Sequence, residues 1–138
     1  MAEGGVAGPH GVLVVDDDED IRDLLREVLV EEGYAVATAC DGHQAMRYLA
    51  ENASPVVMLL DLMMPVKSGW TVLSDLAGQP AVAARVRVVV VSAGGVRSTD
   101  SLGGGVDMVL SKPIDLAALL ATVRRLTGPA FTAPGPPG

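Results

Sequence analysis

Three runs of aliphatic residues stand out along the chain, and a polar residue stops each of them. The runs occupy residues 12–15, 56–60 and 88–91. Because their apolar residues are continuous and do not alternate with polar ones, they are typical of strands in a parallel sheet that helices cover on both faces. Two further segments, residues 34–39 and 107–110, complete a set of five predicted strands.

Segments with helical periodicity lie between the predicted strands. Apolar residues, Leu24 among them, recur every three or four positions in residues 21–29, behind an acidic cluster that suits the start of a helix. Further helices are predicted in residues 41–53, 70–76 and 116–126, where capping residues, glycines and prolines mark most of the ends.

The alternation of five strands with five helices predicts an α/β fold, a doubly wound five-stranded parallel sheet with right-handed crossovers. The fourth crossover, residues 94–105, contains five glycines. Each glycine inside a helix costs roughly 1 kcal/mol relative to alanine, so we expect the fourth helix to be short or irregular. The domain should span residues 11–127. Composition predicts a flexible amino-terminal tail in residues 1–10 and a carboxy-terminal tail or linker stub in residues 128–138.

Composition limits the chain to one small domain and excludes several classes of protein. Of the 138 residues, 49% are hydrophobic, which suffices for one buried core. A formal net charge of -7 argues against direct binding of nucleic acid, because phosphate backbones require a basic surface. The single Cys40 excludes an intramolecular disulfide, and no stretch has the length of a membrane span or the pattern of a signal peptide. We therefore expect a cytoplasmic protein with no direct contact to nucleic acid or membrane.

Polar side chains follow the predicted strands at the points where those strands end. Asp16 and Asp17 follow the first strand, Asp61 the third and Ser92 the fourth, and Lys112 comes just after the fifth. The carboxyl ends of parallel strands share one edge of the sheet, where ligands bind in such folds. Carboxylates that meet there repel one another unless a cation intervenes, and oxygen ligands suit Mg²⁺ or Mn²⁺. With a lysine for phosphate and a serine hydroxyl as donor, the set indicates a phosphoryl-binding site with an aspartate nucleophile.

Taken one at a time, these residues also have ordinary structural explanations. Lys112 alone is most often a solvated surface lysine, Ser92 a turn residue, and Asp61 a helix cap or turn residue. Asp18 and its acidic neighbours suit the start of the first helix. The joint placement of the strand-end residues on one edge favours the functional interpretation.

Four short strings carry a resemblance to a known family. They are Val-Val-Asp16-Asp17, Leu-Leu-Asp61-Leu-Met-Met-Pro65, Val-Val-Ser92-Ala93 and Ser-Lys112-Pro113. In this order they resemble the receiver domain of bacterial two-component response regulators, over about residues 11–127. The resemblance implies a flavodoxin-like receiver fold and a phosphorelay in which Asp61 accepts a phosphoryl group from a histidine of a sensor kinase or histidine phosphotransfer protein. It also implies a switch of protein–protein interactions with an unknown downstream protein. No enzymatic activity is implied beyond Mg²⁺-dependent self-phosphorylation and autodephosphorylation.

The same resemblance assigns the metal ligands. Asp17, Asp61 and the backbone carbonyl of Met63 would hold Mg²⁺ directly, with Asp16 acting through water. These roles agree with the chemistry of phosphoryl transfer, which needs in-line positioning and charge neutralisation more than covalent help from other side chains.

Around the phosphoryl group, the resemblance assigns Ser92 and Lys112 to its oxygens and implies a cis peptide bond before Pro113. The sequence departs from the family three positions before the lysine, where an aromatic residue usually responds to phosphorylation and Val109 stands here. Together with the glycines of residues 94–105, this leads to the hypothesis that ordering or shifting of that segment carries the output signal.

The favoured prediction is a stand-alone receiver that acts as an interaction switch, with no DNA-binding domain in this chain. One alternative is a receiver-fold scaffold that binds partners without phosphorylation. Val109 and the weak fourth helix favour it, and the intact acidic set opposes it. Another is a phosphatase or phosphotransferase that acts on small molecules through an aspartyl phosphate. Such enzymes usually have a second aspartate two residues after the nucleophile, and here that residue is Met63.

Overall fold

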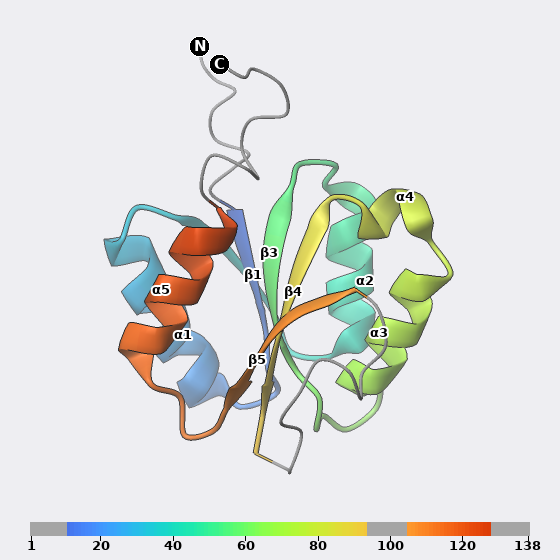
Figure 1. Cartoon of the computed structure of the whole chain (residues 1–138). Coiled ribbons are helices and arrows are strands. Elements are labelled where there is room, and N and C mark those ends of the chain that lie inside the picture. The colour runs from blue at the N-terminus through green and yellow to red at the C-terminus, as the bar shows by residue number, and fades with distance from the viewer. Residues whose placement is uncertain (1–10, 94–104, 128–138) are drawn as a thin grey trace, which may run out of the picture.

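The computed structural model describes residues 11–93 and 105–127, and in them five parallel strands form one sheet (Figure 1). The strands lie in the order β2-β1-β3-β4-β5, so β3 is central. They are β1 (Gly11–Val15), β2 (Ala35–Ala39), β3 (Val56–Asp61), β4 (Val86–Ser92) and β5 (Val106–Ser111). The helices are α1 (Glu19–Glu31), α2 (Gly42–Glu51), α3 (Gly69–Ala77), α4 (Pro80–Ala83) and α5 (Leu116–Leu126). The predicted doubly wound α/β fold is confirmed.

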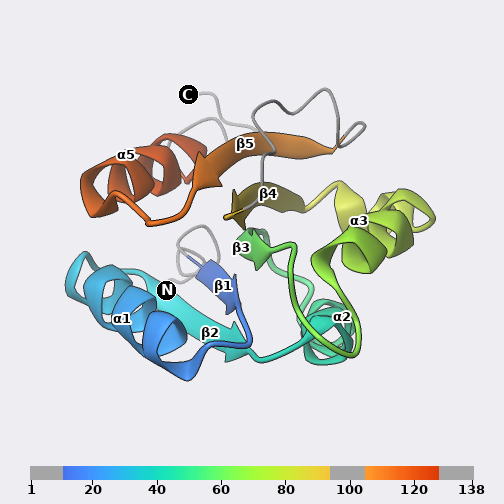
Figure 2. The same ribbon diagram turned by 90° about the horizontal axis from the view of Figure 1, so that it is seen from below.

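Helices cover both faces of the sheet, which explains why the strands are continuously apolar. Figure 2 shows α1 and α5 on one face and α2 and α3 on the other. Successive residues of a strand enter different cores: Leu59 packs with residues of α1 and α5, and Leu60 packs with residues of α2 and α3. All six residues of β3 are buried, including Asp61 at its end. The central strand therefore carries Asp61 to the carboxyl edge of the sheet on a rigid support.

Side-chain caps begin the helices near this edge. Asp18, Asp41 and Asp115 each accept hydrogen bonds from backbone N–H groups in the first turn of α1, α2 and α5. Ser68 caps α3 in the same way. A cap of this kind typically contributes about 1 kcal/mol. Because the caps follow the strands within a few residues, these helices begin at the edge where the strands end.

Two details of the helices differ from the sequence-based expectations. Gly78 and Pro80 predict only the end of a helix, but Pro80 begins α4, a single turn that the pattern did not predict. Proline is compatible with this position because the first N–H groups of a helix have no partner within it. Leu24, which the periodicity groups with the inward-facing residues of α1, is 48% exposed.

Several predictions about the chain concern segments outside the described residues. The fourth crossover helix, expected in residues 94–105, is one of them. Of that segment only Gly105 is described, and it lies in a turn before β5. The predicted tails, residues 1–10 and 128–138, are the others.

A β-bulge interrupts the pairing of β5 with β4. Val88 pairs with Val106, but the next residue of β4, Val89, pairs with Met108, so Asp107 is the extra residue. Its carboxylate oxygen Oδ2 accepts a hydrogen bond of 2.9 Å from the backbone N–H of Val88. The side chain of the extra residue thus replaces a carbonyl of the strand ladder as the acceptor.

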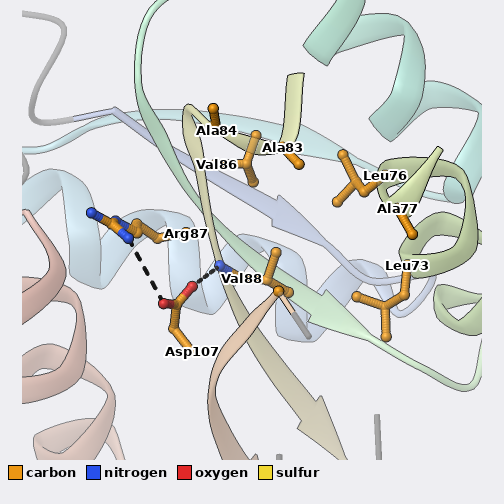
Figure 3. Close-up of a pocket in the computed structure, with 10 residues that line it drawn as sticks. Leu73, Leu76, Ala77, Ala83, Ala84, Val86, Arg87, Val88 and Asp107 are labelled. Atoms are coloured by element: carbon orange, nitrogen blue, oxygen red, sulfur yellow. Dashed lines mark hydrogen bonds and ion pairs between the residues drawn. The ribbon is translucent and has the colours of Figure 1, made fainter. Parts of the chain in front are cut away.

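The bulge borders a small pocket of about 250 Å³, shown in Figure 3. Apolar residues of α3, α4 and the start of β4 line most of it. At its polar side the guanidinium of Arg87 lies 4.0 Å from Oδ1 of Asp107.

Candidate phosphoacceptor and metal site

Among the described residues, three carboxylates gather at the carboxyl edge of β1 and β3. Asp16, Asp17 and Asp61 each offer one oxygen atom, and these oxygens lie within 4.8 Å of one another. The pairing of the two strands brings them together: Val15 pairs with Leu60, so the next residues, Asp16 and Asp61, stand side by side. Asp16 and Asp61 are each 3% exposed, whereas Asp17 is open to solvent. The site therefore combines two buried acids with one that water reaches.

Local hydrogen bonds orient the buried carboxylates. Oδ1 of Asp61 accepts a hydrogen bond of 3.0 Å from the backbone N–H of Met63. Oδ1 of Asp16 accepts one of 2.9 Å from the backbone N–H of Asp18. Each bond closes a tight turn directly after a strand, in which an aspartate side chain binds the backbone two residues on. The turns leave Oδ2 of both carboxylates for other partners.

Lys112 supplies the positive charge that these oxygens face. Its Nζ lies 3.1 Å from Oδ2 of Asp16 and 3.4 Å from Oδ2 of Asp61, and its side chain is 19% exposed. The backbone N–H of Lys112 donates a hydrogen bond of 3.0 Å to the carbonyl of Ser92 at the end of β4. The following peptide bond, to Pro113, is cis, as the resemblance implies.

Burial and charge change the proton affinity of the site. Burial raises the pKa of Asp61 above its ordinary value of 3.8, the hydrogen bond from Met63 lowers it, and the negative charge of Asp16 raises it again. Burial lowers the pKa of Lys112, but its hydrogen bonds and attraction to Asp16 and Asp61 outweigh this and raise the pKa above 10.5. Lys112 is therefore charged at neutral pH, and a further cation beside Asp61 would favour its ionised form.

Ser92 and Met63 also lie near this edge. Asp61 pairs with Val91 of β4, so Ser92 is one residue farther toward the carboxyl edge, and it is 5% exposed. The side chain of Met63 is 65% exposed, while its backbone N–H contacts Asp61. The structure thus places the residues predicted for the site along one edge of the sheet, and their individual roles stay predictions.

Arg22 is a residue of this region that the sequence pattern did not single out. The helical periodicity assigns it to the polar face of α1, but it is partly buried. Its Nη1 donates a hydrogen bond of 2.9 Å to the backbone carbonyl of Asp16. One signal in the sequence could have indicated Arg22. It lies near the start of a helix that begins beside the acidic cluster, so its side chain can reach the residues at the strand end.

In residues 11–93 and 105–127, no helix combines the length and the apolar character that crossing a membrane requires.

Residues 12–124 match the sequence model of the response regulator receiver domain. The chain is 42% identical over 127 residues to the transcriptional regulatory protein PrrA of Mycobacterium tuberculosis, and the alignment covers 88% of this chain and 51% of that protein. It is 40% identical over 118 residues to the response regulator PleD of Caulobacter vibrioides, covering 84% of this chain and 26% of PleD. The chain thus spans about half of PrrA and about a quarter of PleD.

Solved receiver structures have the same fold. The receiver domain of the Francisella response regulator 1452 superposes with a TM-score of 0.74 at 30% identity, over 85% of this chain and 95% of that one. The response regulator TrrA of Thermotoga maritima, in complex with Mg(2+)-BeF, superposes with a TM-score of 0.73 at 28% identity, over 84% and 97% of the two chains. Sequence, fold and relatives agree, and the chain belongs to the response regulator receiver domain family.

Proposed function

We propose that this chain is a phosphoacceptor of a two-component phosphorelay. Asp61 would take a phosphoryl group from a histidine of a sensor kinase or histidine phosphotransfer protein, and the change would switch binding to a downstream protein. The observation that carries the proposal is the convergence of the Asp16, Asp17 and Asp61 carboxylates with Lys112 at one edge of the sheet. The cytoplasm stays the predicted compartment.

The carboxylates fit Mg²⁺ or Mn²⁺. Their oxygens are hard donors within 4.8 Å of one another, and an ion of this kind binds through one or two carboxylates and keeps positions for water and phosphate oxygens. We assign Asp17, Asp61 and the Met63 carbonyl as direct ligands and Asp16 as a partner through water. When bound, the ion neutralises negative charge on the phosphoryl oxygens.

Asp61 acts as the nucleophile in the proposed reaction. A carboxylate oxygen attacks the phosphorus of the donor phosphohistidine while the P–N bond breaks, its electron pair stays on the imidazole nitrogen, and an acyl phosphate forms on Asp61. The ammonium of Lys112, already beside Asp61, would bind one phosphoryl oxygen, and the Ser92 hydroxyl would donate to another. Attack by water on the phosphorus of the acyl phosphate breaks the P–O bond to Asp61, which returns as a carboxylate while inorganic phosphate leaves. The proposed catalysis is limited to these two self-directed steps.

One observation favours a second function, a scaffold that acts without phosphorylation. Val109 stands in β5 at the family's aromatic position and packs, partly buried, against the core on the side of α2 and α3. The rotamer change of an aromatic residue therefore cannot transmit the signal at this position. The hypothesis that residues 94–105 transmit it instead concerns a segment that lies outside the described residues, except for Gly105.

Incubation with Mg²⁺ and acetyl phosphate, followed by mass spectrometry of the intact protein, tests the proposal. We expect the wild type to gain one phosphoryl group and Asp61→Asn to gain none. Asp20→Asn removes an acid of the same sequence cluster that lies outside the three-carboxylate group, and it should react like the wild type. A wild type that gains no phosphoryl group from either acetyl phosphate or a phosphohistidine donor would favour the scaffold.

A further inference from the structure

The loop between β3 and α3, residues 62–68, carries the Met63 carbonyl and also contains a strained residue. Val66 has a φ of 66°, in the left-handed region that β-branched residues rarely adopt. Its side chain is 83% exposed, so burial of that side chain does not offset the strain. Strained conformations of this kind persist only where the surrounding structure holds them. Contacts on either side of Val66 must therefore hold the loop.

Backbone hydrogen bonds fix the two ends of the loop. The N–H of Gly69 donates a bond of 3.1 Å to the carbonyl of Leu62, which closes the loop at its base. The N–H of Gly42, at the start of α2, donates a bond of 3.1 Å to the carbonyl of Lys67. The residue directly after Val66 is thus tied through its backbone to a neighbouring helix.

The side chain of Lys67 also links the loop to α3. Its ammonium forms an ion pair with the carboxylate of Asp75, in the second turn of that helix. Lys67 is 17% exposed and Asp75 35% exposed, so the pair is partly shielded from water. The stem of Lys67 lies close against α2, because a Cβ added to Gly42 would be 2.6 Å from its Cγ. Such a pair is screened less by solvent and salt than one on the open surface.

We propose that Lys67 and Asp75 are positioning residues of the metal site. Their ion pair holds the β3–α3 loop, which includes Met63 with the carbonyl assigned to the metal, in its strained conformation. This inference rests on the proposed function, because it concerns the metal affinity of the same site. Neither residue of the pair belongs to the strings on which the family resemblance rests. The family resemblance therefore assigns no role to this ion pair.

Mg²⁺ titrations followed by the backbone amide NMR signals of Asp17 and Met64 test the proposal. Partners that orient metal ligands typically change affinity by tenfold or more, and a restraint several residues from the ligand should act more weakly. We expect Lys67→Met and Asp75→Asn each to raise the Kd for Mg²⁺ by about three- to tenfold. The double variant should show no more than the larger single effect, because either change breaks the same pair.

Two further variants separate positioning from general loss of structure. Lys67→Arg keeps the charge and should bind Mg²⁺ within about twofold of the wild type. Glu32→Gln removes a different ion pair, which joins the residue after α1 to Arg124 of α5 at 3.5 Å, and it should leave the Kd unchanged. Circular dichroism checks the fold of each variant. Asp75→Asn keeps the size of the side chain and so provides the test if Lys67→Met does not fold.

The outcomes distinguish this inference from the proposed function. An unchanged Kd in folded Lys67→Met or Asp75→Asn, or fully additive effects in the double variant, would overturn the positioning role while the metal site stands. A wild type without any Mg²⁺-dependent shift, or an Asp61→Asn variant that binds as tightly as the wild type, would overturn the metal site itself.

Discussion

Nζ of Lys112 lies 3.1 Å from Oδ2 of Asp16, a residue 96 positions earlier in the chain. The same ammonium is 3.4 Å from Oδ2 of Asp61. Lys112 therefore compensates the charge of both buried carboxylates before any phosphoryl group is present. In addition to the role that the sequence predicts for it at the phosphoryl oxygens, this lysine supports the resting structure.

Replacing Lys112 by methionine should destabilise the Mg²⁺-free protein. The buried carboxylates of Asp16 and Asp61 lose their partner, so we expect the free energy of unfolding to fall by about 1–2 kcal/mol at neutral pH. Because the pKa of Lys112 is raised in the folded protein, its contribution is fully present below the ordinary value of 10.5 and is lost as the pH rises through the folded-state pKa. Urea denaturation at neutral and mildly alkaline pH should give the same loss. Arg124→Met, which removes an exposed charge, is the control, and a Lys112→Met variant as stable as the control would contradict the prediction.

Asp61→Asn should stabilise the Mg²⁺-free protein at neutral pH. Burial, and then the charge of Asp16, raise the folded-state pKa of Asp61, so its ionised form destabilises the fold above that pKa. The destabilisation disappears as the pH falls toward the ordinary value of 3.8, and the gain of the variant should shrink with it. Thermal unfolding across this pH range measures the difference. A gain that does not depend on pH would show that ionisation of Asp61 is not its cause.

Gly69→Ala should disrupt the start of α3 and the end of β3 together. A Cβ at this position would overlap the backbone oxygen of Asp61 and lie 2.7 Å from Cα of Leu62, so the backbone must shift. We expect a loss of about 2–3 kcal/mol in the free energy of unfolding and weaker Mg²⁺ binding. Gly78→Ala is the matched control, because its nearest neighbour would be the Asp75 carbonyl oxygen at 3.6 Å, and it should change stability by about 0.5 kcal/mol or less. Equal stabilities of the two variants would contradict the prediction.

Asp107→Ala should lower the free energy of unfolding by about 1–2 kcal/mol, because the backbone N–H of Val88 loses its acceptor at the bulge. Asp107→Asn keeps an acceptor oxygen and should lose less than half as much. Chemical denaturation of the two variants measures the difference. If both variants lose the same amount, the hydrogen bond to Val88 is not what Asp107 contributes.

The sequence predicts the strands and the acidic site well because both depend on local signals. Leu59 and Leu60 belong to one continuous run, which follows directly from helices on both faces of the sheet. Asp16 and Asp61 follow buried strands directly, so the parallel topology alone brings them to the same edge.

Other features depend on how elements pack and leave little trace in the sequence. The Lys67–Asp75 pair requires the loop to fold back along α3, which no local pattern predicts. The left-handed backbone of Val66 is not predicted either, because glycine or asparagine usually adopts that conformation. Leu24 fits the helical period of α1, but its side chain is 48% exposed, because the period gives the direction of the apolar face and not how much of that face is covered.

The bulge in β5 decides which way the rest of that strand faces. Val106 packs against the core on the side of α2 and α3, and Met108, two positions later, packs against the core on the other side. In a regular strand, residues two positions apart share a face, so Asp107 shifts the alternation by one step. Without it, the residues that lead into Lys112 would be turned over. The contact between Lys112 and Asp16 thus depends on one inserted residue near the start of β5, because that residue determines which face of the sheet each later side chain occupies.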